Sequence, residues 1–101
     1  MYTQKEATLT MRTPLVESTE LDTNVYRCEV LEYDESKEKI LLQLKGSKIQ
    51  NLTLNAMYEC QILLEEKGIL CTGLIRERYI DERGCILNFR VESGFYEISI
   101  K

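Results

Sequence analysis

Apolar and polar residues alternate along most of the chain from residue 25 onward. A period of two turns successive side chains to opposite faces of an extended backbone, so it predicts β-strands with one buried face. The strands are separated by short segments that contain Gly, Asp, Glu or Ser, as is typical of turns. We predict six strands, at residues 25–33, 39–45, 57–64, 69–80, 85–91 and 95–100.

The first 24 residues have a much weaker pattern than the rest. They are rich in Thr and Glu, contain the only proline, Pro14, and alternate only briefly around Leu9 and Met11. We interpret residues 1–24 as an extended N-terminal arm. Six consecutive short strands favour a meander that closes on itself. We therefore expect an all-β protein, a small six-stranded antiparallel split barrel at residues 25–101 that follows the arm.

The turn sequences predict how neighbouring strands pair. Gly68 and Gly84 can adopt the positive φ that hairpin loops at 65–68 and 82–84 require, and the turn at 34–36 has no glycine. The predicted opposite pairs are Val30 with Ile40, Ile62 with Cys71, and Ile75 with Val91. This register also turns Glu77 inward, opposite Phe89, and leaves that polar residue on the apolar face without a partner.

The segment 55–67 is ambiguous, because Ala56, Cys60 and Leu63 also fit one face of a helix. We interpret it as a strand, and the predicted barrel depends on that choice. Three apolar residues of the preceding connection are expected to plug one end of the barrel: Ile49, Leu52 and Leu54.

The composition excludes several classes of function. The 101 residues include 17 acidic and 13 basic side chains, a formal net charge of −4, and no histidine. Without histidine, Ser-His-Asp and Cys-His catalytic arrangements are impossible, and the commonest metal ligand is missing. A net negative charge disfavours nucleic acid as a partner. We therefore expect neither an enzyme nor a cofactor.

The beginning of the chain is polar and lacks the apolar run of a secretory signal. No apolar stretch is long enough to span a bilayer. These observations predict a cytoplasmic protein with no membrane contact. A reducing compartment would keep its thiols free.

Four cysteines occur singly, and each falls on the apolar phase of an alternating segment: Cys28, Cys60, Cys71 and Cys85. Structural zinc sites usually take paired cysteines two residues apart, and no such pair is present. We predict no metal site. Cys60 and Cys71 would lie diagonally across a hairpin, but a cytoplasmic location disfavours a disulfide. All four are expected to be core residues that react slowly with thiol reagents until the protein unfolds.

An arginine cluster on the outer face is a candidate binding site. The predicted register places Arg76 opposite Arg90 and Arg78 opposite Asn88. Like charges across a ladder repel each other. One interpretation is that nearby acids and water screen these exposed arginines, which then have no binding role. The alternative is a small anion or nucleotide site, because the arginine fork suits phosphate and carboxylate groups.

Apolar residues also occur on the phase that should face water. Single exposed apolar residues are normal, but a set spread over neighbouring strands indicates that something covers it. Either the arm covers this surface or it is an interface with a protein partner or a second copy of the chain. The candidate interface residues are Leu41, Met57, Leu63, Leu74 and Ile86.

Residues 26–30, 40–44, 52–60 and 73–78 resemble the PilZ superfamily in strand order, in loop lengths and in the Leu52-Thr53-Leu54 approach to the third strand. The likeness is nearest to the N-terminal barrel of flagellar brake proteins. It implies a bacterial six-stranded split barrel associated with motility and cyclic di-GMP signalling. Together with the apolar outer face, it makes a non-catalytic barrel that acts through protein contacts the leading hypothesis, and the anion or nucleotide site is the alternative. The cyclic di-GMP motifs of the family, Arg-x-x-x-Arg and Asp/Asn-x-Ser-x-x-Gly, are absent, so the resemblance assigns no ligand-binding residue and disfavours cyclic di-GMP as a ligand.

Overall fold

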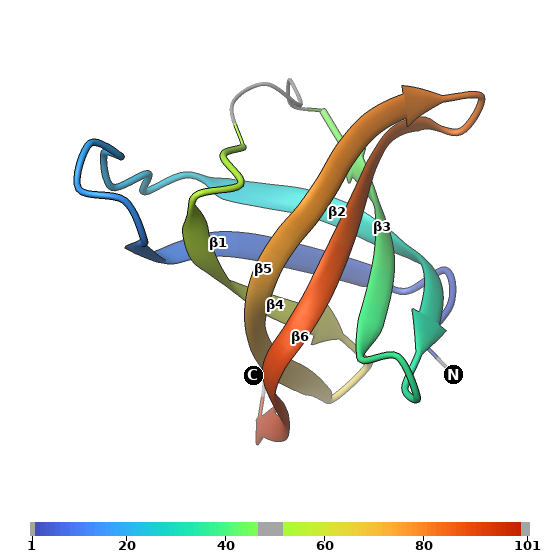
Figure 1. The fold of residues 1–101 in the computed structure, drawn as a ribbon. Helices are drawn as coiled ribbons and strands as arrows, with labels where there is room; N and C mark the ends of the chain where they lie inside the picture. Colours follow the sequence, from blue (N-terminus) through green and yellow to red (C-terminus); the bar gives the residue numbers. More distant parts are fainter. Residues whose placement is uncertain (1, 47–51, 100–101) are drawn as a thin grey trace.

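The computed structural model describes residues 2–46 and 52–99. These residues form six β-strands and no helix, so no helix of the described chain is long and apolar enough to cross a membrane. Figure 1 shows the strands in chain order. They are β1 (Glu6–Pro14), β2 (Val25–Asp34), β3 (Lys39–Lys45), β4 (Ala56–Leu63), β5 (Lys67–Asp81) and β6 (Gly84–Ser99).

The strands form one closed antiparallel sheet in the order β1-β2-β3-β6-β5-β4, with β1 also paired to β4. The all-β prediction and the number of six antiparallel strands are confirmed. The N-terminal arm is wrong, because Glu6–Pro14 is the strand that joins β2 to β4 and closes the sheet. The segments that carry the PilZ resemblance lie in β2, β3, β4 and β5 and, for residues 52–55, in the connection before β4.

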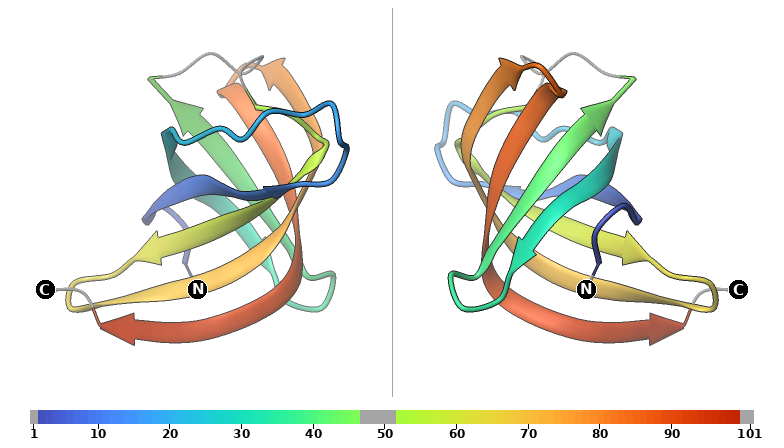
Figure 2. Two further views of the ribbon diagram at one scale, coloured as in Figure 1. Left: turned by 90° about the vertical axis from the view of Figure 1, so that its left-hand side faces the viewer. Right: turned by 90° about the vertical axis from the view of Figure 1, so that its right-hand side faces the viewer.

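The predicted and observed structures both have six strands, but not the same six. The predicted strands 85–91 and 95–100 are one continuous strand, β6, and residue 100 lies outside the described residues. β5 and β6 pair along almost their whole length and extend beyond the closed part of the sheet (Figure 2). The ambiguous segment is a strand, β4, as predicted.

The inward phase of the predicted strands is right except in β5 beyond Ile75, where Glu77 faces outward, and the register of all three hairpins is wrong. Val30 lies opposite Leu42, Ile62 opposite Ile69, and Gly73 opposite Val91. A shift of two residues keeps every side chain on its own face, so alternation cannot detect it. Short turns and three β-bulges in the β5–β6 ladder set the true register.

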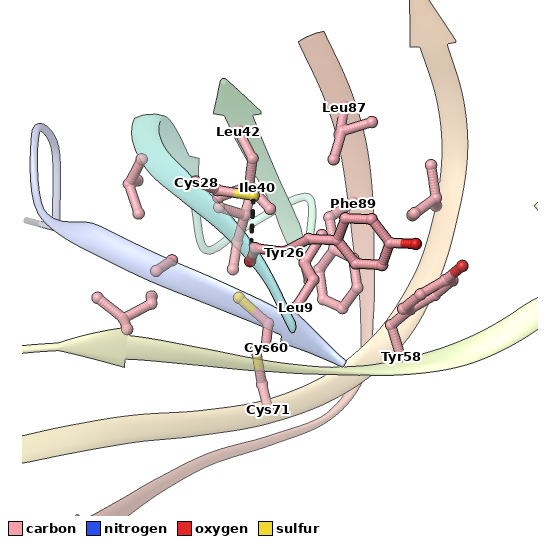
Figure 3. Packing of buried hydrophobic residues seen from close by; sticks show 14 of the residues in the cluster. Leu9, Tyr26, Cys28, Ile40, Leu42, Tyr58, Cys60, Cys71, Leu87 and Phe89 are labelled. Atoms are coloured by element: carbon pink, nitrogen blue, oxygen red, sulfur yellow. Dashed lines mark hydrogen bonds between the residues drawn. The ribbon is translucent and has the colours of Figure 1, made fainter. Parts of the chain in front are cut away.

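The interior of the sheet is filled by one apolar cluster, in which Tyr58 and Phe89 are the largest fully buried side chains. Figure 3 shows side chains from all six strands converging on this core. One end is covered by Leu52, which is buried as predicted, whereas Leu54 is exposed and Ile49 lies outside the described residues. At the other end the rings of Tyr2, Tyr33 and Phe95 pack in series, with centroids 5.3 and 5.1 Å apart.

Candidate basic pocket

A β-bulge in β5 sets the position of the predicted arginine cluster. Ile75 lies opposite Phe89 and Glu77 lies opposite Asn88, so Arg76 is the extra residue between them. The bulge turns Glu77 to the outer face, where its Oε1 accepts a hydrogen bond of 3.0 Å from Asn88 Nδ2. The inward Glu77 of the predicted register is therefore wrong, and a bulge is the reason.

Arg76 and Arg90 lie together in an open pocket of about 350 Å³ on the outer face. Lys39, at the start of β3, is paired directly with Arg90 across the β3–β6 ladder. Lys37 reaches the same pocket from the turn between β2 and β3. We call this the basic pocket, and its lining residues are Lys37, Lys39, Arg76, Glu77, Asn88 and Arg90.

The turn that carries Lys37 is fixed by local hydrogen bonds. Asp34 Oδ1 accepts bonds from Ser36 Oγ at 2.7 Å and from the Lys37 amide at 3.3 Å. The bond from Ser36 is the main cause that lowers the pKa of Asp34. The amide of Val91 donates to the Glu38 carbonyl at 2.8 Å and ties the turn to β6. Lys37 is thereby held next to the strand that carries Arg90.

The charge of the basic pocket is only partly balanced. Within residues 2–46 and 52–99, no ion pair joins its four cations to a carboxylate, and Glu77 is hydrogen-bonded to Asn88. Other basic residues of the surface do have carboxylate partners: Arg12, Arg27, Lys45, Lys67 and Arg83. Unpaired cations that converge on a concave surface produce a local positive potential that attracts anions.

Arg78 does not join the other two arginines. The bulge at Arg76 shifts the strand by one residue, so Arg78 lies opposite Leu87. Its Nη1 donates a hydrogen bond to the carbonyl of Leu52, at the end of the core that Leu52 covers. The predicted set of three is therefore corrected to two arginines in the pocket and one that holds the connection before β4.

Lys37 and Lys39 were missed by sequence reasoning. The only sequence signal was their alternation with Glu38, at the beginning of a strand whose inner face is apolar. Their approach to Arg90 depends on the pairing of β3 with β6, which are more than forty positions apart in the chain. Local patterns contain no information on such a pairing.

The five predicted interface residues do not form one exposed surface. Leu41 is 8% exposed and Ile86 is completely buried, although both lie on the outer phase. Ile86 is flanked by Gln43 and Tyr79 on the neighbouring strands, and the Gln43 amide bonds to the Arg83 carbonyl at the hairpin turn. Long polar side chains thus bury apolar residues on the outer face.

Met57, Leu63 and Leu74 are half-buried. Met57 lies opposite Leu74 and lines a groove of about 290 Å³. Arg12, on one side of this groove, is paired with Glu59 at 3.0 Å, and Tyr96, on the other side, is largely exposed. Of the five predicted residues, only Met57 lines this groove, whose other lining residues are both apolar and polar.

The four cysteines are all free. Cys28, Cys60 and Cys71 are buried as predicted, whereas Cys85 is partly exposed. Cys60 and Cys71 lie directly opposite each other on β4 and β5 rather than diagonally (Figure 3). Among the described residues, no cluster of three or more Cys, Asp or Glu side chains has the arrangement of a metal site.

No family model, no curated protein and no solved structure was found to match this chain. Its class is therefore defined by its own structure. It is an all-β protein with six antiparallel strands in a closed sheet, and a basic pocket lies where β3, β5 and β6 meet the β2–β3 turn.

Proposed function

We propose that this protein is a non-catalytic binding module, a PilZ-like split barrel, that binds a small anionic ligand in the basic pocket. The observation that carries the proposal is the convergence of Lys37, Lys39, Arg76 and Arg90 on one cavity. The two arginines offer planar forks that fit phosphate or carboxylate oxygens, and the lysines add compact point charges.

The lining residues favour binding over chemistry. They comprise four cations, one carboxylate and one amide, and the carboxylate and the amide are bonded to each other. No thiol or hydroxyl group lines the pocket as a nucleophile, and the chain has no histidine to activate one. An anion held here would be positioned and desolvated on one side, with no group poised to attack it.

The test is calorimetric titration of the full chain with inorganic phosphate at low ionic strength. We expect binding, and we expect Arg76→Gln and Arg90→Gln each to weaken it about tenfold or more, since a hydrogen bond to a charged group contributes roughly 1.5–3 kcal/mol. Arg27→Gln is the matched control, because Arg27 is exposed and lies outside the pocket. An equal loss in Arg27→Gln would refute the proposal, and so would absence of heat both with phosphate and with larger phosphate-containing anions.

A second function is contact with a partner protein or with a second copy of the chain, as the PilZ resemblance favours through its link to motility and cyclic-dinucleotide signalling. The groove lined by Met57 and Tyr96 is the observation that supports it. Light scattering should detect a dimer that Met57→Glu and Tyr96→Glu, both in the groove lining, abolish without loss of folding. Ile86 is unsuitable for this test, because a charge at a fully buried position would unfold the chain. A monomer that is unaffected by both changes would exclude self-association through the groove.

A further inference from the structure

We propose that the ligand of the basic pocket is a compact molecule with two linked phosphate groups, and that the pocket recognises these phosphates without contacting an aromatic base. This inference rests on the proposed anion-binding function and adds the chemical class of the ligand. Three properties of the pocket carry it, namely its charge, its size and the absence of aromatic side chains from its lining.

The charge of the pocket matches two phosphates better than one. Four cations and one carboxylate leave a formal charge of three positive units on the lining. A phosphate monoester carries about 1.5 to 2 negative charges near neutral pH. One such group would leave part of the positive charge unbalanced, whereas two linked phosphates would neutralise it.

The size of the pocket leads to the same ligand. A volume of about 350 Å³ lies at the lower end of small-molecule sites. A single phosphate fills only part of this space. A diphosphate fills more of it and reaches cations from separate segments, with Lys37 on the turn and Arg76 on the bulge of β5.

Among the described residues, none of those that line the pocket is aromatic. Proteins that hold a nucleobase commonly stack it on Phe, Tyr, Trp or the guanidinium plane of Arg. Here the two guanidinium groups are the forks available to the phosphates, and the remaining groups are lysines, one amide and one carboxylate. A nucleoside attached to the diphosphate would therefore extend into solvent and add little to the affinity.

The experiment compares ligands that differ in one feature at a time. The full chain is titrated at one fixed ionic strength, in magnesium-free buffer, with sodium diphosphate, ADP, sodium phosphate and AMP. We expect diphosphate and ADP to bind within about threefold of each other and at least tenfold more tightly than phosphate and AMP. Lys37→Gln should reduce this preference for diphosphate, and Lys45→Gln, which removes a lysine paired with Glu29 outside the pocket, should leave it unchanged.

The other possible results of this titration distinguish failure of the diphosphate inference from failure of the anion-binding function. Equal affinities for phosphate and diphosphate would overturn this inference and leave the anion-binding function intact. ADP binding at least tenfold tighter than diphosphate would overturn it as well, because it would reveal recognition of the base. A failure of all four ligands to bind would refute the proposed function itself. Thermal melting of Lys37→Gln checks the fold, and the exposed position of Lys37 predicts no change.

Discussion

Burial determines the acid–base behaviour of the core thiols. Burial of the Cys28 side chain among apolar residues raises its pKa from 9.0 to about 12. The pKa of Cys60 is also raised, first by its hydrogen bond with Cys71 and then by burial. Both thiols are therefore neutral at physiological pH. Neutral, buried thiols are poor metal ligands and poor nucleophiles, which agrees with their role in packing.

The raised pKa of Cys28 predicts a loss of stability at alkaline pH. The unfolded chain loses the thiol proton near pH 9 and the folded chain only near pH 12, so stability falls as pH rises through this window. The slope from one such group is at most about 1.4 kcal/mol per pH unit, and it approaches that value once the unfolded thiol is fully ionised. Urea unfolding between pH 9 and 10 should show a shallower decline for Cys28→Ala than for the unchanged protein. Tyr26, whose pKa burial raises from 10.0 to about 12, contributes equally to both proteins and does not affect the difference between their slopes. Identical slopes in the two proteins would contradict the prediction.

Partial exposure of Cys85 predicts an order of reaction with thiol reagents. Cys85 lies next to the β5–β6 turn and is the only one of the four that is not buried. Native protein treated with a maleimide should be modified first at Cys85, while Cys28, Cys60 and Cys71 stay protected until denaturant is added. Peptide mass spectrometry identifies the modified residue. Early modification of Cys60 or Cys71 would mean that the β4–β5 interior opens readily.

At the scale of the strands, the sequence predicted which face of each strand is buried but not how the strands pair. The alternation around Cys28, Cys60 and Leu87 identified the core face correctly. A slip of two residues preserves that face, so the predicted and observed registers fit the pattern equally well. Glu77, left inward by the predicted register, was the one sign of a missing bulge. That bulge also separates Arg78 from the basic pocket.

The first strand was missed because its composition is atypical of a core strand. β1 contains four residues with hydroxyl side chains or the proline ring, and only Ala7 and Leu9 are buried. Its pairing with β4 is a contact between residues about fifty positions apart.

Only two of the four cations of the basic pocket were predicted, also because of long-range pairing. Arg76 and Arg90 belong to one hairpin, whereas Lys37 and Lys39 reach them through long-range pairing.

The close crossing of β5 and β6 at Gly73 predicts a large effect of a single methyl group. A Cβ atom at residue 73 would lie 2.0 Å from the carbonyl oxygen of Arg90, which is backbone and cannot move aside. Gly73→Ala should therefore destabilise the protein by about 3 kcal/mol or more, in the upper range for single substitutions. Gly46→Ala is the control, since no atom of the described residues lies within 4 Å of its added Cβ and the opposing factor is the positive φ, at about 1–2 kcal/mol. Equal midpoints for the two variants in urea unfolding would show that the crossing is not tight.

At the scale of the whole molecule, net charge and local charge have opposite signs. The chain carries four more negative than positive charges, yet the basic pocket concentrates four cations around one carboxylate. Net charge governs long-range attraction to large polyanions, whereas a small ligand responds to the potential within a Debye length, about 8 Å at physiological salt. The acidic composition that disfavours nucleic acid therefore permits an anion site. The closed sheet creates the basic pocket, since its cations come from β3, β5, β6 and one turn.

Closure of the sheet by β1 predicts a strong dependence of the whole fold on Leu9. Its backbone is paired with Tyr26 of β2 and with Cys60 of β4, and its side chain is completely buried. Leu9→Ala should destabilise the protein by about 2–5 kcal/mol, because it removes core contacts on the strand that holds both neighbours. Leu15→Ala deletes the same atoms just beyond β1, where Leu15 is 54% exposed, and should change stability by no more than about 0.5 kcal/mol. Urea unfolding followed by circular dichroism measures both variants. If residues 1–24 were an arm outside the core, the two substitutions would have similarly small effects, so a large difference between them is the result that closure by β1 requires.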